Sequence, residues 1–289
     1  MQEQTGYLTA GGGVGLFFRF WRGREPPRGH VVIVHGANEH SGRYRHVAEF
    51  LVQHGLEVAA LDQRGHGRSD GPRCHVDRFG EYLDDLRQFV GMVAQRAGDQ
   101  RRPIMIGHSL GGLIAFSYAV AHPASIAALV VSSPWFALRM KVSRVERALA
   151  PVISRLLPRL QRPANILPEQ LSRDPEVVRA YREDPLVGTT ATPRWFVECS
   201  RAAWRARHEL ADRLSVPALF LQGEDDRVVD PEATRAVFEG VTYGRKALRL
   251  YPGRYHEIFN DPGHEEVFRD IIEWLDAQGL LGAKRLTAV

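Results

Sequence analysis

The chain has 289 residues, of which 44% are apolar and 25% charged, and its formal net charge is +4. This composition is ordinary for a globular protein, and so small a charge gives no case for a nucleic-acid partner. The amino-terminal residues lack the pattern of a signal peptide, and no stretch approaches the roughly 18 apolar residues that span a bilayer. The two widely separated cysteines, Cys74 and Cys199, fit a reducing compartment. We therefore expect a cytoplasmic protein.

Apolar runs and amphipathic stretches alternate along the first half of the chain. A glycine-rich turn at 11–15 divides residues 7–22 into two short predicted strands. Further strands are predicted at 30–34, 57–61, 103–106 and 127–131, with helices that end near 54 and span 79–97 and 113–121. Such alternation with short connections builds a mostly parallel sheet flanked by helices.

The alternation stops after Pro134. Residues 135–213 contain two plausible helical regions, several prolines and no convincing strand, and we predict that they form a helical lid over the carboxyl edge of the sheet. The remaining elements are strands at 218–221 and 247–251, helices at 231–240 and 265–277, and a loose tail at 280–289. The sequence thus predicts an α/β core, 1–134 and 214–289, with a lid inserted at 135–213.

The stretch Gly107-His108-Ser109-Leu110-Gly111 lies between a predicted strand and a predicted helix. This G-x-S-x-G pattern is typical of a nucleophile elbow, a turn so sharp that the residues two before and two after the serine must lack a Cβ. The alternative is an ordinary glycine-rich turn with an incidental serine. The partners of Ser109 must decide, because a serine hydroxyl needs a base and an acid that orients the base.

Three aspartates follow the strand at 218–221, and each is a candidate for that acid. Asp226 is preferred because it lies far enough past the strand to turn back over the sheet edge. Asp225 is the alternative. Asp230 precedes Pro231 and is typical of a helix N-cap.

His256 follows the strand at 247–251 and is the predicted base, whereas His264 belongs to the start of the last helix. The order serine, acid, histidine matches that of hydrolases with this elbow. An oxyanion site also needs two backbone N–H donors. Leu110, directly after the serine, supplies one, and Ala37, in the loop after the first central strand, supplies the other.

Twelve histidines raise the question of a metal site. The sequence contains no H-E-x-x-H motif, and His35 and His40 are spaced wrongly for one helix face. We predict no metal and no cofactor.

With these residues in place, the chain resembles the α/β hydrolases of the monoacylglycerol lipase and lysophospholipase branch. The motifs that carry the resemblance are H-G-x-x-E-H-x-x-R-Y at 35–44, D-x-x-G-H-G-x-S at 62–69, G-H-S-L-G-G at 107–112, G-x-D-D-R at 223–227, Y-P-G-x-Y-H at 251–256 and D-P-L at 184–186. Their combination looks like the bacterial monoacylglycerol lipases and is far more specific than the elbow alone.

The resemblance implies that lipid carboxylic esters are cleaved through an acyl-serine intermediate. Long-chain monoacylglycerol is the preferred substrate, with lysophospholipid or a short-chain ester as alternatives. A non-catalytic ligand-binding scaffold, an acyltransferase and a haloperoxidase remain open. The implied residues are the triad Ser109, Asp226 and His256, the oxyanion donors Ala37 and Leu110, and Glu39, Arg43 and Tyr181 near the glycerol end. Glu39 and Arg43 fit an ion pair that braces the oxyanion loop equally well.

Residues 138–162 combine apolar side chains with a local net charge of +6, more than that of the whole chain. Their basic residues are Arg139, Lys141, Arg144, Arg147, Arg155, Arg159 and Arg162, against the single acidic residue Glu146. We expect such a lid to make peripheral contact with anionic membranes. The alternative is a helix packed on the core with solvated arginines. The sequence predicts no particular oligomeric state.

Overall fold

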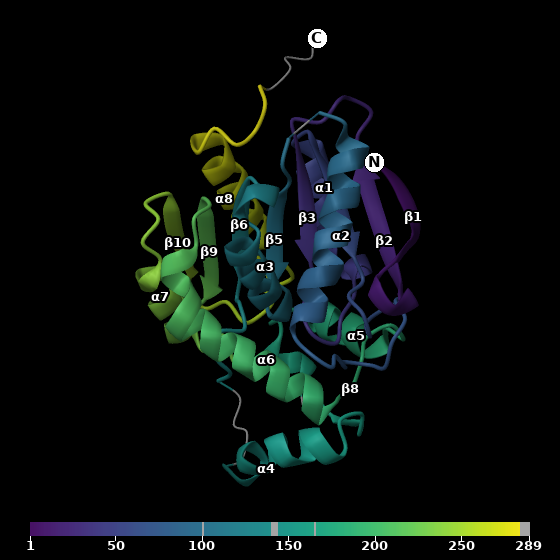
Figure 1. The fold of residues 1–289 in the computed structure, drawn as a ribbon. Coiled ribbons are helices and arrows are strands. Elements are labelled where there is room, and N and C mark those ends of the chain that lie inside the picture. Colours follow the sequence, from purple (N-terminus) through teal and green to yellow (C-terminus); the bar gives the residue numbers. More distant parts are fainter. Residues whose placement is uncertain (100, 140–143, 165, 284–289) are drawn as a thin grey trace.

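A central twisted sheet organises the molecule (Figure 1). The computed structural model describes residues 1–99, 101–139, 144–164 and 166–283. Within these residues the sheet has eight strands in the order β1-β2-β4-β3-β5-β6-β9-β10. β1 and β4 both pair antiparallel with β2, and the other neighbours are parallel. The strands are β1 (Gln2–Thr9), β2 (Gly15–Arg22), β3 (Gly29–Val34), β4 (Leu56–Leu61), β5 (Ile104–His108), β6 (Ala128–Ser132), β9 (Ala218–Gly223) and β10 (Lys246–Tyr251).

Helices cover both faces of the sheet, as the sequence predicts. α1 (Arg45–Gln53) and α8 (His264–Ala277) lie on one face, and α2 (Gly80–Ala97), α3 (Leu110–Ala121) and α7 (Pro231–Gly240) lie on the other. Among the described helices, none combines the length and apolar content needed to cross a bilayer.

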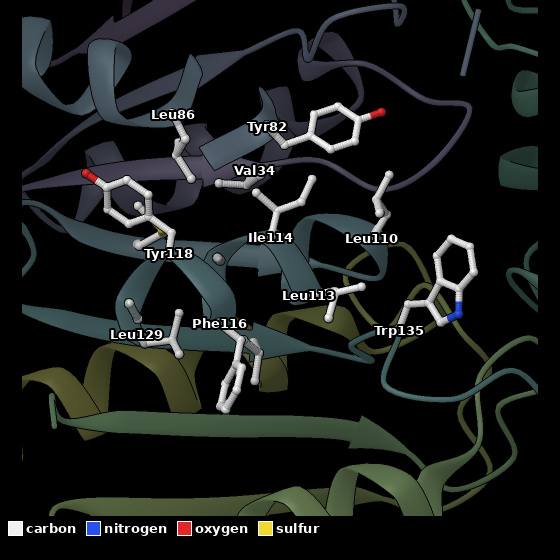
Figure 2. Packing of buried hydrophobic residues seen from close by; sticks show 14 of the residues in the cluster. Val34, Tyr82, Leu86, Leu110, Leu113, Ile114, Phe116, Tyr118, Leu129 and Trp135 are labelled. Carbon is white, nitrogen blue, oxygen red and sulfur yellow. The ribbon is translucent and has the colours of Figure 1, made fainter. Parts of the chain in front are cut away.

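The central strands are apolar throughout because both of their faces are buried. In β3, Val31 and Ile33 belong to the core beneath α1 and α8, whereas Val32 and Val34 belong to the core beneath α2 and α3. Successive side chains of a strand point to opposite faces, so an uninterrupted apolar run fits only a strand covered on both sides. Figure 2 shows Ile114 of α3 beside Val34, with Leu86 of α2 across from them.

The chain between β6 and β9 adds no strand to the described sheet. It contains α4 (Arg144–Leu156), α5 (Pro175–Glu183) and α6 (Pro193–Arg205), and β7 (Arg162–Pro163) pairs antiparallel with β8 (Thr190–Ala191). The sequence predicts two helical regions and no strand here. The described structure has one helix more than predicted and one short pair of strands. A nine-residue helix and two-residue strands are too short to give a clear periodic signal. α4 packs on α6 and lies far from the sheet (Figure 1).

Both ends of the described chain are more ordered than predicted. β1 begins at Gln2 rather than near Tyr7, because its whole length pairs with β2. Gly282 donates its N–H to the carbonyl of Arg28 at 2.9 Å, and Arg28 Nε donates to the carbonyl of Gly282 at 2.7 Å. The predicted loose tail is thus wrong at residues 280–282, and residues 284–289 lie outside the described chain.

Candidate active site

Ser109 occupies the sharp turn between β5 and α3. Its φ is 53°, a backbone angle that residues other than glycine rarely adopt. Its N–H donates to Ser132 O at 3.0 Å. A Cβ on Gly107 would lie 2.3 Å from Gly111 O, and a Cβ on Gly111 would lie 2.0 Å from Val34 O. Both glycines are therefore sterically required, as the elbow pattern predicts.

The structure brings the three predicted side chains of the triad together at the carboxyl edge of the sheet. His256 Nε2 lies 2.9 Å from Ser109 Oγ, and His256 Nδ1 lies 2.8 Å from Asp226 Oδ2. The other oxygen of Asp226 accepts the backbone N–H groups of Val228 and Val229 at 2.8 and 2.9 Å. These bonds aim the carboxylate at the imidazole.

The competing aspartates have other positions. Asp225 is exposed, and Asp230 caps α7 by accepting the N–H of Glu232 at 3.1 Å. His264 is the first residue of α8, as expected. Of the three aspartates after β9, only Asp226 contacts His256 within the described chain.

The electrostatics of the site keep Asp226 ionised and make His256 a better base. Burial disfavours the imidazolium, but the charge of Asp226 and its hydrogen bond raise the pKa of His256 above the ordinary value. Burial likewise opposes the carboxylate, yet His256 and the two amides lower the pKa of Asp226. His108 packs on His256 with ring centroids 4.8 Å apart, and burial and His256 lower its pKa to about 4. A neutral His108 therefore adds no second positive charge beside the base.

The two predicted oxyanion donors flank Ser109. Leu110 is the first residue of α3, where a backbone N–H has no partner within the helix. Ala37 lines the same small cavity as Ser109. Its loop is held from behind by Glu39, whose Oε1 accepts the N–H of Gly36 at 2.5 Å.

Glu39 and Arg43 belong to a buried ionic network beneath the oxyanion loop. Arg43 Nη1 donates to Glu39 Oε2 at 2.8 Å, and its two terminal nitrogens bind both oxygens of Glu257 at 2.7 Å. Tyr44 donates its hydroxyl to Glu39 at 2.6 Å. Burial opposes the charge of Glu257, but Arg43 lowers the pKa of this carboxyl to about 2. The contacts of Glu39 and Arg43 are those of the bracing ion pair.

Two contacts of the site leave no signal in the sequence, those of Glu257 and of Arg139. Glu257 directly follows the predicted base, but nothing in its spacing points to Arg43, which lies 214 positions earlier. Arg139, one of the basic residues of 138–162, is exposed, and its Nη1 donates to Asp226 O at 2.8 Å. No periodic signal reports such contacts, because they form between distant loops.

The cavity above Ser109 is small. Its volume is about 20 Å³, room for roughly one water molecule. The segment between β6 and β9 contributes Ile166, Leu171 and Tyr181 to its walls, and the core contributes Gly36, Ala37, Glu39, His108, Ser109, Val228, His256 and Glu257. The ring of Tyr181 also lies against the Arg43 guanidinium, 4.8 Å from ring centroid to Cζ.

The mostly parallel sheet, the strand-to-helix turn at Ser109, and the acid and histidine after β9 and β10 define an α/β hydrolase. A family model described as "Serine aminopeptidase, S33" matches residues 25–263. The chain belongs to this hydrolase family.

Two curated relatives and one solved structure illustrate the similarity. A monoacylglycerol lipase of Mycolicibacterium smegmatis is 38% identical over 264 residues, covering 91% of this chain and 94% of the relative. The phospholipase YtpA of Bacillus subtilis is 31% identical over 83% of this chain and 92% of its own. The crystal structure of a monoacylglycerol lipase from Paleococcus ferrophilus superposes with a TM-score of 0.81 at 37% identity, covering 91% of this chain and 98% of that one.

Proposed function

We propose that this chain is a serine ester hydrolase that cleaves lipid carboxylic esters, with long-chain monoacylglycerol as its preferred substrate. The observation that carries the proposal is the continuous hydrogen-bonded series Ser109–His256–Asp226, with Ser109 on a strained elbow beside two candidate oxyanion donors. The relatives at 38% and 37% identity, both monoacylglycerol lipases, support the substrate class.

The geometry suits acyl transfer in two halves. Ser109 Oγ attacks the ester carbonyl carbon while His256 Nε2 takes its proton, and the carbonyl oxygen becomes an oxyanion facing the N–H groups of Ala37 and Leu110. The C–O bond to glycerol then breaks, and the proton on Nε2 passes to the departing alkoxide. Water repeats the sequence on the acyl-serine ester, which releases the fatty acid and restores the Ser109 hydroxyl. Asp226 holds the imidazole in orientation throughout.

We further propose that residues 135–213 act as a lid. A cavity of about 20 Å³ cannot hold a lipid ester, so a substrate must displace part of its wall. Ile166, Leu171 and Tyr181 are the wall residues that come from this segment. Glu39 and Tyr181 line the cavity and are proposed to meet the glycerol head group, whereas Arg43 acts behind them by holding Glu39.

The family description names an aminopeptidase, and the site offers an argument against peptide N-termini. An aminopeptidase needs a free carboxylate for the substrate's ammonium group. Among the described residues that line the cavity, Glu39 and Glu257 carry carboxylates outside the triad, and both are paired with Arg43. The arrangement therefore favours an uncharged ester over a peptide N-terminus.

A hydrolysis panel tests the activity and the substrate together. It compares short-chain esters, monoacylglycerols, diacylglycerols, lysophospholipids and an aminoacyl anilide. We expect the highest kcat/KM on long-chain monoacylglycerol, and loss of roughly 10⁴- to 10⁶-fold in kcat for Ser109→Ala. Ser117→Ala, on the same helix about two turns further along, is the matched control. Preference for lysophospholipid would favour a phospholipid substrate, the class named for the Bacillus relative. An active Ser109→Ala would refute the mechanism.

The lid is also proposed to dock on anionic membranes through α4 and the residues after it. Apolar side chains there face solvent: Leu149, Val152, Leu156, Leu157 and Leu160, with Leu156 72% exposed. Arg155, Arg159 and Arg162 are exposed beside them. Arg139 is exposed too, but its Nη1 is engaged by Asp226 O. Lys141 lies outside the described residues, as do the side chains of Arg144, Glu146 and Arg147.

Co-sedimentation with phosphatidylserine-containing vesicles at low salt tests this docking. We expect binding that weakens with salt, because the arginines are exposed, and that falls in Leu156→Ser. Tyr7→Ser is the control, because Tyr7 is 62% exposed on the distant strand β1. An equal loss of vesicle binding in both variants, or no binding by the wild type, would contradict the docking proposal.

A further inference from the structure

The segment that follows α5 contacts the oxyanion loop through a histidine–aspartate pair. His40 Nε2 lies 2.8 Å from Asp184 Oδ2, and His40 is nearly buried. The other ring nitrogen, Nδ1, accepts the N–H of Gly42 at 3.1 Å. This bond places the proton of the neutral ring on Nε2, so that the ring donates to Asp184. Asp184 Oδ1 accepts the N–H of Leu186 at 2.8 Å, which orients the carboxylate.

A second contact joins the same two segments four residues later. Gly188 donates its N–H to the carbonyl of Asn38 at 2.8 Å. A Cβ on Gly188 would lie 2.7 Å from Asn38 Oδ1, so the side chain of Asn38 would have to shift to admit it. Asn38 has a φ of 61°, and its Oδ1 accepts the thiol of Cys74 at 2.9 Å. A backbone held in this region of φ/ψ space needs such support from its surroundings.

The N–H of Ala37 lies between two anchors of the oxyanion loop. On one side the Gly36 N–H is bound by Glu39, and on the other the Asn38 carbonyl is bound by Gly188. The first anchor belongs to the core of the molecule. The second belongs to the segment inserted between β6 and β9, and the Asp184–His40 pair reinforces it from the far end of the loop.

We propose that Asp184 and Gly188 are positioning residues of the oxyanion hole, which hold the Ala37 N–H through His40 and Asn38. This inference rests on the proposed esterase function. It assigns residues 184–188 a part in catalysis, because the Ala37 N–H reaches its working position only while these residues keep their contacts with the oxyanion loop. Displacement of the segment therefore weakens stabilisation of the transition state more than it weakens substrate binding.

Kinetics on Asp184→Ala and Gly188→Ala test the proposal. Complete loss of one oxyanion donor commonly lowers kcat about 10²- to 10³-fold, and we expect a partial loss, about 10- to 100-fold, from a misplaced one. KM for a water-soluble ester should change less than about threefold, because the ground-state carbonyl makes weaker use of the donors. Asp184→Asn should recover only part of the activity, because its single amide oxygen can accept the Nε2–H of His40 or the N–H of Leu186 but not both.

Inhibitor binding separates positioning from general loss of structure. Ser109 Oγ adds to the carbonyl of an alkyl trifluoromethyl ketone and forms a tetrahedral oxyanion. Across the variants, the affinity for this inhibitor should fall in proportion to the fall in kcat/KM. A non-hydrolysable ether analogue of monoacylglycerol should bind them all alike. Proportional weakening of both ligands would mean that the segment shapes the substrate pocket, and would overturn the positioning role.

A matched pair elsewhere in the molecule provides the control. His30 Nε2 lies 3.1 Å from Asp99 Oδ2 at the opposite edge of the sheet, and Asp99 also accepts a backbone N–H two residues on. The side chains of Asp99 and Asp184 are 29% and 26% exposed. His30 also contacts Glu57 Oε2 through Nδ1 at 3.2 Å, so the two pairs differ in their other partners. Asp99→Ala removes a histidine–aspartate contact far from the site and should leave kcat unchanged.

The outcomes distinguish this inference from the function beneath it. If Ser109→Ala is inactive while Asp184→Ala and Gly188→Ala keep kcat within twofold of the wild type, the positioning role fails and the esterase stands. If Ser109→Ala retains activity, the esterase mechanism itself fails. Should Asp184→Ala not fold, Gly188→Ala and Asp184→Asn carry the same comparison.

Discussion

The guanidinium of Arg139 donates a hydrogen bond to the backbone carbonyl of Asp226, with Nη1 and O 2.8 Å apart. The backbone N–H of Arg139 also donates to Val228 O at 2.9 Å, and Leu138 forms an isolated antiparallel β-bridge with Val229. The chain that leaves β6 is thereby tied to the loop that carries Asp226, the proposed acid of the triad. Arg139 therefore contacts the backbone of the loop that holds Asp226.

We expect Arg139→Gln to lower kcat about fivefold on a short, water-soluble ester, since a hydrogen bond of about 1 kcal/mol then no longer positions the acid loop. Arg155→Gln, an exposed arginine of α4, should leave that rate unchanged and weaken only vesicle binding. Assays with and without anionic vesicles measure both effects. Equal kinetics for the two variants in solution would contradict the role of Arg139.

The pH dependence of kcat/KM should report His256. The base must be neutral to take the proton of Ser109, so activity is lost as pH falls through its pKa. Because Asp226 raises that pKa, we expect the acidic limb to have its midpoint above the ordinary value of 6.5. Asp226→Asn removes the raising charge and should shift the limb to lower pH while lowering kcat about 10⁴-fold. His108, with a pKa near 4, titrates outside this limb.

The elbow glycines should differ sharply from a glycine in open space. Gly111→Ala places a Cβ 2.0 Å from Val34 O, and we expect the free energy of unfolding to fall by about 3 kcal/mol or more. Gly91 lies exposed within α2 and nothing stands within 4 Å of its added Cβ. Gly91→Ala should raise stability by about 0.5–1 kcal/mol through helix propensity. Urea denaturation of both variants measures the contrast.

The Arg43 network should make stability depend on pH in the acid range. Burial opposes ionisation of Glu257, but Arg43 lowers its pKa from 4.5 to about 2. A carboxyl whose pKa is lowered by folding stabilises the native state above the unfolded value, and that contribution is lost as pH falls through the folded value. The free energy of unfolding should therefore drop between about pH 4.5 and pH 2, and this drop should shrink in Glu257→Gln.

Removing the cation instead should harm the fold at neutral pH. Arg43→Met leaves two buried carboxylates without their partner, and we expect a loss of about 3–5 kcal/mol. Arg45→Met is the control, because its pairs with Glu3 and Glu49 are largely exposed. A Tm for Arg43→Met close to that of Arg45→Met would show that the network contributes little.

Local patterns sufficed to predict most of the sheet and the three side chains that meet at its edge. Buried strands are continuous apolar runs, and the elbow needs glycines at fixed spacing, so β3, β5 and Ser109 leave signals within a few residues. Reach past the strand alone favours Asp226 over Asp225 and Asp230, and Asp226 contacts His256. Parallel strands end at the same edge, which is why residues after β9 and β10 fall together.

The contacts that brace the site left no such signal. Glu257 and Arg43 meet across 214 positions, and Asp184 and His40 across 144. These residues lie within recognisable sequence motifs. Which acidic side chain binds which basic one, however, depends on how the loops pack against one another. The separation of α4 from the sheet was equally hidden, because its apolar residues fit a buried helix as well as an exposed one.

The pairing of β6 with β9 has a consequence for how the molecule can change. Leu129 is aligned with Ala218, and Ser133 donates its N–H to Leu221 O at 2.8 Å, so both ends of the intervening chain are fastened to adjacent strands. The entropy of closing such a loop grows only with the logarithm of its length, about 0.6 kcal/mol for each doubling. Segments of quite different length and sequence can therefore be exchanged at this point without disturbing the sheet. Hybrids that carry another hydrolase's segment here should keep the esterase core and acquire the donor's substrate preference. The new segment must still provide a hydrogen bond to the carbonyl of Asn38.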